Sequence, residues 1–388
     1  MKKLLILAAM AGVALVSCVK NEPAPSVTDQ QEITFAPPVV GVNTKTVTLV
    51  TNDNISGSFG VFGYYHPETY STINASGTYL YMDNVHVSRQ TYTIESTDYP
   101  TWTTTSVNDY YWPKTGKMTF AAYYPAYTNT DAVDDFNVAH TGNGIQFENY
   151  VVGDDANVDL MFSERSYNQT KDDEKLQTNP QFYGVQLNFK HALSAVRFKF
   201  KAATNLVDDD GGPKYTFKIK NVTVQNVHSK GTFNQRLTDG ASAETPVASA
   251  TDWTTSLERP YTAYDNTTGF DVNSTTFEDD SYETNATDPE VNLILLPQAL
   301  NHAGENNVTI QVTYDLRHHL MAENEWITGN VVNAELATGS LSQWLRGNIY
   351  TYNLTLDLDK IEFAPSVTSW DEYSTAQEVT VDNQVTNP

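Results

Sequence analysis

The residues best suited to chemistry are the eight histidines, and the densest group is His318 and His319 with Glu323 and Glu325 close behind. Imidazole and carboxylate groups together bind Zn²⁺ and related ions. A helix brings two histidines onto one face when they stand four residues apart, whereas neighbouring residues of a strand point to opposite faces. One ion therefore cannot easily bind both imidazoles of this pair. The sequence predicts no metal site and no cofactor.

Other catalytic arrangements are not found in the sequence either. It has no G-x-S-x-G nucleophile elbow and no glycine loop that cradles phosphate, which Gly57-Ser58-Phe59-Gly60 resembles only superficially. His191 stands beside alternating apolar residues, which is typical of a hydrogen-bonded structural histidine. Carboxylates are too numerous in this chain for any pair to indicate glycoside hydrolysis. We therefore predict that the protein is not an enzyme.

Two aromatic clusters, Tyr110-Tyr111-Trp112 and Tyr123-Tyr124, allow two interpretations. Exposed aromatic rings could stack on the rings of sugars. Buried rings instead fill the core and the corners of a β-sandwich. The core interpretation is the commoner one, and a glycan-binding surface is kept as the alternative.

Length and charge limit what these residues can do. At roughly 150 residues per domain, a chain of 388 residues holds two or three domains. Asp and Glu number 47 against 23 Lys and Arg, which gives a net charge of −24. Nucleic acids and anionic lipid surfaces are bound by clustered positive charge. The composition therefore argues against nucleic acid as a partner and against a basic membrane-binding face.

The N-terminus has the pattern of an export signal. Met1 to Lys3 is positively charged, and Leu4 to Val16 is an unbroken apolar stretch of signal-peptide length. The following Leu15-Val16-Ser17-Cys18 resembles the bacterial lipobox, and Cys18 is the single cysteine of the chain. We expect residues 1–18 to be a lipoprotein signal peptide, with lipid on Cys18 anchoring the protein in the outer membrane. An ordinary secretory leader is the alternative.

The rest of the chain has the pattern of β-structure. The polar, proline-containing residues 19–31 are expected to form an extended tether. From there on, short alternating segments rich in Tyr, Thr, Val and Phe are separated by Gly, Asn, Asp and Pro, which predicts antiparallel strands. In the clearest of them Val196, Phe198 and Phe200 alternate with basic residues. Helical periodicity is confined to short stretches, of which Leu341–Leu345 is a candidate helix.

The apolar pattern is interrupted at Ser163–Gln181, where we predict the domain boundary. An N-terminal domain is predicted at 32–175 and a C-terminal domain at 182–370, which leaves 371–388 as a tail. The polar stretch Thr238–Glu290 is expected to form long loops of the second domain, because it has too few apolar residues for its own core. The predicted fold class is all-β, with two tandem antiparallel β-sandwich domains.

Five segments carry a resemblance that covers nearly all of the mature chain. They are Gly60–Tyr65, Tyr111–Pro125, Val158–Phe162, Leu187–Ser194 and Trp344–Trp370. In this order and spacing they resemble the fimbrillin family, the subunits of type V pili and related surface lipoproteins of Gram-negative gut and oral anaerobes. The resemblance implies that both sandwiches are transthyretin-like and that the role is non-enzymatic, as a pilus subunit or adhesin.

The resemblance also implies how such a subunit assembles. In polymerising members, the lipidated precursor reaches the cell surface and a trypsin-like protease cuts after a basic residue that follows the first strand. Loss of that strand opens a groove, which an extended segment of another subunit fills by donor-strand exchange. Lys45, between Ile33–Ala36 and Val47–Val50, stands about where this cut would fall. Arg is the usual residue there, and an exposed, uncut lysine is the alternative.

The C-terminal tail contains a candidate donor strand. Beyond Trp370, Tyr373, Val379, Val381 and Val385 fall on one parity of an alternating segment. Three valines inserted into a neighbour's groove would contribute roughly 5–8 kcal/mol before ordering costs. A disordered tail, or an edge strand of the chain's own domain, is the alternative.

Three functional hypotheses remain open. The first is a lipid-anchored precursor that, once processed, joins other fimbrial subunits of its own or a homologous kind in the fimbrium. The second is an uncleaved pilus anchor or tip protein, surface-exposed and held in the cell outer membrane by lipid on Cys18. The third is a surface glycan-binding lipoprotein. The sequence does not identify the host or bacterial surface ligand.

Overall fold

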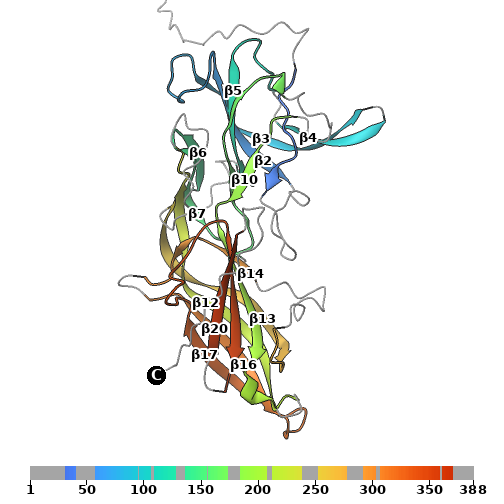
Figure 1. The fold of residues 1–388 in the computed structure, drawn as a ribbon, viewed down its shortest axis with the longest axis vertical. Coiled ribbons are helices and arrows are strands. Elements are labelled where there is room, and N and C mark those ends of the chain that lie inside the picture. The colour runs from blue at the N-terminus through green and yellow to red at the C-terminus, as the bar shows by residue number, and fades with distance from the viewer. Residues whose placement is uncertain are drawn as a thin grey trace, which may run out of the picture.

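The computed structural model is all-β, as the sequence predicts. It describes residues 31–40, 57–94, 96–105, 109–127, 136–154, 156–173, 184–207, 212–237, 252–277, 292–302, 306–358 and 361–369. Within these ranges no helix is long and apolar enough to cross a membrane. The molecule is elongated, with one sheet at one end and the remaining large sheets at the other (Figure 1).

The strands are β1 (Val39–Val40), β2 (Ser58–His66), β3 (Tyr79–Ile94), β4 (Thr97–Thr104), β5 (Lys117–Tyr124), β6 (Asn137–Thr141), β7 (Gly144–Val151), β8 (Met161–Ser163), β9 (Ser166–Gln169), β10 (Asn188–His191), β11 (Ser194–Ala202), β12 (Tyr215–Asn234), β13 (Trp253–Val272), β14 (Asn292–Leu295), β15 (Gln298–Ala299), β16 (Thr309–His318), β17 (Ile327–Glu335), β18 (Gln343–Trp344), β19 (Asn348–Leu356) and β20 (Ile361–Ser369). A 3₁₀ turn, η3 (Thr204–Leu206), lies between β11 and β12.

The first sheet has the order β1-β10-β8-β5-β2-β3-β4, with β9 also paired to β5. Its central strands are buried on both faces, because successive side chains of a strand point to opposite sides. Phe59 and Phe120 belong to a hydrophobic cluster on one face. Phe62 and Tyr123 belong to the main cluster on the other face, which continues into the rest of the molecule. The sheet is therefore the middle layer of the N-terminal half.

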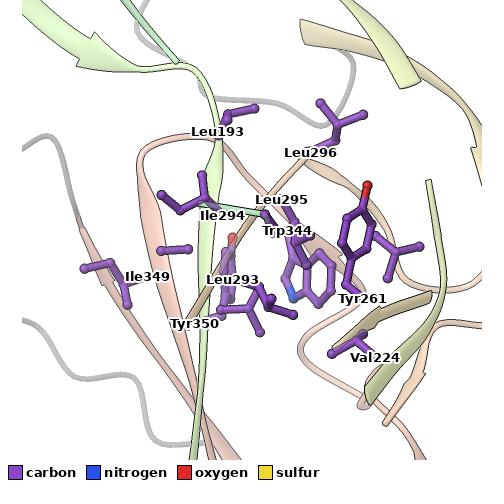
Figure 2. Close-up of a cluster of buried hydrophobic side chains, with 14 of the residues drawn as sticks. Leu193, Val224, Tyr261, Leu293, Ile294, Leu295, Leu296, Trp344, Ile349 and Tyr350 are labelled. Atoms are coloured by element: carbon purple, nitrogen blue, oxygen red, sulfur yellow. The ribbon is translucent and has the colours of Figure 1, made fainter. Parts of the chain in front are cut away.

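The second half is organised around β12 and β13, two strands of 20 residues each. β12 pairs with β13 along one edge, and with β16 and then β7 along the other. A second sheet has the order β14-β11-β19-β20, in which β11 and β19 are parallel. Figure 2 shows side chains of the core between these strands, among them Leu295, Trp344 and Tyr261, all at most 1% exposed.

The β6–β7 hairpin connects the two halves. It precedes the predicted boundary within Ser163–Gln181, yet β7 pairs with β12 of the second half. Gln235, 1% exposed, fixes the hairpin at this point: its Oε1 accepts from the amide of Ile145 at 2.8 Å and its Nε2 donates to the carbonyl of Ser163 at 3.2 Å. The division into two separate domains stays a prediction, as do the transthyretin-like tandem sandwiches.

A buried polar group joins the same hairpin to the first sheet. Arg165 donates from Nε to Nε2 of His140 at 3.2 Å and from Nη2 to the carbonyl of Thr141 at 2.8 Å. Since Nε2 of His140 accepts, its Nδ1 is the protonated nitrogen, and it donates to the hydroxyl of Tyr64 at 3.0 Å. Burial, and then the charge of Arg165, lower the pKa of His140 to about 3. The imidazole is therefore neutral at physiological pH.

The chain crosses between the halves a second time without a linker. β10 of the first sheet ends at His191 and β11 of the second half begins at Ser194. The two residues between them, Ala192 and Leu193, are fully buried. The indole Nε1 of Trp253 donates to the carbonyl of Ala192 at 2.7 Å, so β13 also holds this crossing.

Two expectations from the sequence are wrong. The stretch Thr238–Glu290 contains the long strand β13, which a loop prediction missed because its mostly polar side chains lie at a solvated sheet edge. Leu341–Leu345 is not a helix: its residues Gln343–Trp344 form β18, which pairs with β15. Trp344 is held there by an indole hydrogen bond of 3.0 Å to the hydroxyl of Tyr352, a tertiary contact that outweighs local propensity.

Candidate functional site

Residues 31–36 lie extended in a gap, called the groove below, between β4 and the residues that lead into β10. Their apolar side chains belong to the cluster on one face of the first sheet. Ile33, Phe35 and Ala36 are fully buried, whereas Glu32 and Thr34 are half-buried. Isolated bridges join Glu32 to Tyr111 and Phe35 to both Trp102 and Val185. The alternation of apolar and polar residues in this segment therefore matches a strand with one side chain row facing the core.

Backbone hydrogen bonds hold both edges of this segment. On one edge, the amide of Ile33 donates to the carbonyl of Tyr110 at 2.8 Å, and that of Phe35 donates to the carbonyl of Trp102 at 2.8 Å. On the other edge, the amide of Ala36 donates to the carbonyl of Val185 at 3.0 Å. The segment thus fills a strand-shaped gap between two parts of the chain that are far apart in sequence. Immediately after it, β1 continues parallel to β10.

The ring of Phe35 is the main apolar anchor. It makes edge-to-face contacts with Phe59 at 6.0 Å and with Phe120 at 5.5 Å between ring centroids. Such contacts add to the gain from burying the ring itself. Burial of Ile33 and Phe35 is worth about 1.5–3 kcal/mol for each side chain, or about 3–6 kcal/mol for the two. The segment is held by non-covalent contacts of moderate strength.

Gly184 lets the segment approach the sheet closely. Its φ is +106°, in a region that favours glycine. A Cβ built there would lie 2.5 Å from the carbonyl carbon of Phe35 and 2.7 Å from the amide nitrogen of Ala36. Sequence reasoning did not single out this residue. The one signal available was a glycine directly before the alternating apolar residues Val185, Leu187 and Phe189.

One end of the groove carries negative charge. Burial, and then the charge of Asp109, raise the pKa of Glu32 above its ordinary value. The amide of Trp112 donates to the carbonyl of Gln31 at 2.9 Å, so the segment is hydrogen-bonded to the sheet from its first described residue. What this arrangement can do is bind an extended strand.

The sequence-predicted site residues fall outside the part of the chain that the structure describes. They are Cys18, Lys45, Tyr373, Val379, Val381 and Val385. The described segment ends at Val40, five residues before Lys45 in the sequence. The predicted roles of all six residues stay predictions.

Two predictions about individual histidines can be compared with the structure. His191 is fully buried and its Nδ1 lies 3.0 Å from an oxygen of Asp159, which confirms a hydrogen-bonded structural histidine. The rings of His318 and His319 lie 4.4 Å apart, so the expectation that they point to opposite faces is wrong, because β16 ends at His318 and His319 lies in the following turn. A different trio, His228, Glu258 and His302, is the one cluster of three potential metal ligands within the described ranges. No sequence pattern indicates this trio, because 30 and 44 residues separate its members.

The aromatic clusters contribute to the core. Trp112 is 4% exposed and Tyr123 is fully buried. The hydroxyl of Tyr123 donates to Oδ1 of Asn84 at 2.5 Å, and burial raises the pKa of this tyrosine to about 12. These two rings therefore pack the interior, as the core interpretation expected, and offer no face to a sugar.

Comparisons with known proteins find a matching family and several solved structures that resemble this one. The model of a family described as fimbrillin-like matches residues 44–370. A fimbrial protein from Bacteroides vulgatus has the same fold with 17% identity, over 88% of this chain and 100% of that chain, at a TM-score of 0.50. A putative cell adhesion protein from Bacteroides uniformis is 16% identical over 89% and 99% of the two chains, with a TM-score of 0.49. The C-terminally truncated tip fimbrial protein Mfa3 from Porphyromonas gingivalis is 10% identical over 81% and 94%, with a TM-score of 0.34. No curated protein matches the chain.

Proposed function

The chain belongs to the fimbrillin-like family, and from this premise we propose that it is a fimbrial subunit that assembles by donor-strand exchange. Family membership supports a structural, non-enzymatic role at the cell surface and assembly with other fimbrial subunits. The finer proposal is a precursor anchored in the outer membrane by lipid on Cys18. A cut after Lys45 removes its first segment, and a strand of another subunit replaces it.

The observation that carries this proposal is the burial of residues 31–36. Ile33, Phe35 and Ala36 are fully buried in a gap whose two walls, around Trp102 and Val185, both hydrogen-bond to the segment. A gap of this form accepts any extended chain that presents main-chain groups to both walls and apolar side chains to the floor. Residues 31–36, which fill this gap, precede Lys45 in the sequence. After a cut behind Lys45, only non-covalent contacts would hold them to the rest of the molecule.

The spacing of the tail fits the requirements of the groove. Ile33 and Phe35 stand two residues apart and both face the core. Val379 and Val381 have the same separation in the candidate donor strand. Because alternate residues of a strand share a face, both valines would enter the groove together. Valine is smaller than phenylalanine, so the donor would fill the groove less completely than Phe35 does.

The N-terminus of the protein on native cells tests the proposal. The measurement is N-terminal sequencing and intact mass of protein taken from the cell surface and from sheared fimbriae. Protein that begins at Thr46 without lipid supports processing and polymerisation. Protein that begins only at acylated Cys18 rejects the stalk-subunit role and leaves an uncleaved anchor or tip protein.

A second experiment tests the donor strand itself. Protein cut after Lys45 is mixed with a labelled peptide of residues 371–388, and binding is measured by fluorescence anisotropy. A peptide with Val379→Ser and Val381→Ser should lose binding, whereas a control with Glu378→Gln and Thr380→Ser should keep it. Equal binding of both peptides would show that the alternating valines do not determine insertion.

A further inference from the structure

A cluster of three side chains that could bind a metal ion lies in the C-terminal half, away from the groove. His228 of β12 and Glu258 of β13 are direct cross-strand partners. His302, which follows β15, completes the trio. One nitrogen or oxygen of each residue lies within 4.8 Å of the corresponding atoms of the other two. Three segments of the chain thus bring two imidazoles and a carboxylate together.

The orientation of His302 suits a metal ligand. Its Nε2 lies 2.9 Å from the carbonyl oxygen of Ala299, and its Nδ1 lies 3.0 Å from Oε1 of Glu258. When Nε2 carries the proton and donates to this carbonyl, the 3.0 Å contact between Nδ1 and the carboxylate oxygen requires a proton or a metal cation between the two atoms. A backbone carbonyl that accepts from one ring nitrogen commonly orients the other nitrogen toward a metal. The side chain of His302 is 3% exposed and that of Glu258 is 27% exposed, so the cluster has a buried and a solvent-accessible side.

The backbone at His228 is fixed by a buried glutamine. Oε1 of Gln298 accepts from the backbone amide of His228 at 2.8 Å, and Nε2 of Gln298 donates to the backbone carbonyl of His228 at 3.3 Å. Gln298 is 2% exposed. The imidazole of His228 also has a partner in the strand opposite, because its Nδ1 lies 2.8 Å from the hydroxyl oxygen of Thr255. The cluster is therefore supported by surrounding hydrogen bonds.

We propose that His228, Glu258 and His302 form a binding site for a divalent transition metal, with Zn²⁺ as the best-fitting ion. Two imidazoles and one carboxylate are a ligand set that suits Zn²⁺, and water supplies the fourth position on the exposed side of Glu258. Mg²⁺ and Ca²⁺ prefer oxygen ligands and fit this set poorly.

Metal binding requires a small local change. The rings of His228 and His302 are stacked, with 4.0 Å between centroids and 10° between planes. A nitrogen lone pair lies in the plane of its ring, so two parallel stacked rings cannot both direct a lone pair at one ion. Tetrahedral ligation also brings the ligand atoms to about 3.3 Å from one another. The half-buried ring of His228 must therefore turn out of the stack, while His302 stays in place on Ala299.

An ion at this position would connect β12, β13 and the segment after β15. Because only the folded chain brings these three residues together, binding should stabilise the folded state. Because imidazole ligands must be deprotonated, the affinity should fall as the solution becomes acidic. The proposed site lies in the half that carries the C-terminal tail and does not depend on the proposed strand exchange.

The test is isothermal titration of the full mature chain, freed of metal with EDTA, with Zn²⁺ and separately with Mg²⁺. We expect one Zn²⁺ per chain, a raised thermal unfolding midpoint, and no binding of Mg²⁺. Co²⁺ in place of Zn²⁺ should give the visible absorption of a four-coordinate site. His302→Ala and the partly exposed Glu258→Gln should each weaken binding more than about 100-fold, with folding checked by circular dichroism.

The matched control is the double variant His318→Ala and His319→Ala, which removes the other close pair of histidines. It should bind Zn²⁺ as tightly as the unmodified chain. Absence of Zn²⁺ binding by the unmodified chain overturns the proposal. So does binding that survives in a folded Glu258→Gln variant, or binding that is lost in the control.

Discussion

The contact between Gly184 and the first segment gives the sharpest prediction. Left-handed backbone alone destabilises an alanine by roughly 1–2 kcal/mol. A Cβ at Gly184 would also lie 2.5 Å from Phe35 and 2.7 Å from Ala36, both backbone atoms that cannot rotate away. Overpacking of this kind adds about 1–3 kcal/mol. We therefore expect Gly184→Ala to lower the free energy of unfolding by about 2–5 kcal/mol.

A second glycine separates the two contributions. Gly329 has φ +75°, and a Cβ there would meet no atom within 4 Å. Gly329→Ala should therefore show the backbone strain alone, at about 1–2 kcal/mol. Urea unfolding of both variants, followed by tryptophan fluorescence, gives the two energies.

Hydrogen exchange locates the effect of Gly184→Ala. The amides of Phe35 and Ala36, which donate to Trp102 and Val185, should lose protection in Gly184→Ala and keep it in Gly329→Ala. If both variants lose the same stability and both amides stay protected, the first segment is not packed against Gly184 and the description of the groove is wrong.

Three further predictions concern the first segment and the β6–β7 hairpin. Phe35→Ala should lower the free energy of unfolding by about 3–5 kcal/mol in urea titrations, because it empties the floor of the groove; a loss below about 1 kcal/mol would contradict its role as anchor. The pKa of His140 is lowered to about 3 in the folded protein. Below about pH 6.5 its imidazole is therefore protonated in the unfolded chain but stays neutral in the folded one. Stability should therefore fall by about 2 kcal/mol between pH 7.5 and pH 5 through this residue, and His140→Gln should remove that part of the pH dependence; an unchanged pH profile would refute it. Gln235→Ala should lose about 1–3 kcal/mol because it leaves the amide of Ile145 and the carbonyl of Ser163 without their partner, and an unaltered thermal midpoint would contradict this.

The strands that the sequence predicts are those with strict alternation. Val196, Phe198 and Phe200 are buried in β11, and the three basic residues between and after them are half-buried, as the pattern requires. The alternation can be recognised in the sequence because one side of β11 packs against the core and the other remains accessible to water. β2 and β5 show no such alternation, because most of their residues are buried; what marks them as strands is their content of aromatic and β-branched residues.

The parts that sequence reasoning missed depend on long-range pairing. β13 is mostly polar and becomes a strand through its pairing with β12, which begins 38 residues before it. Glu258 meets His228 only because this hairpin has a particular register, and His302 joins them from a third segment. The buried first segment was anticipated as a strand, but its walls at Trp102 and Val185 were not. No local pattern encodes which distant residues will lie opposite one another.

The short crossing at Ala192 and Leu193 has a mechanical consequence. A chain pulled at its two ends transmits tension from β10 directly into β11, with no flexible linker that could extend first. β10 is bonded laterally to β8, and β11 is bonded to β19 over eight residue pairs. Force along these strands loads the lateral hydrogen bonds in shear, so many must break together. The junction between the halves should therefore act as a stiff joint that bears load, and extension under force should begin elsewhere in the molecule.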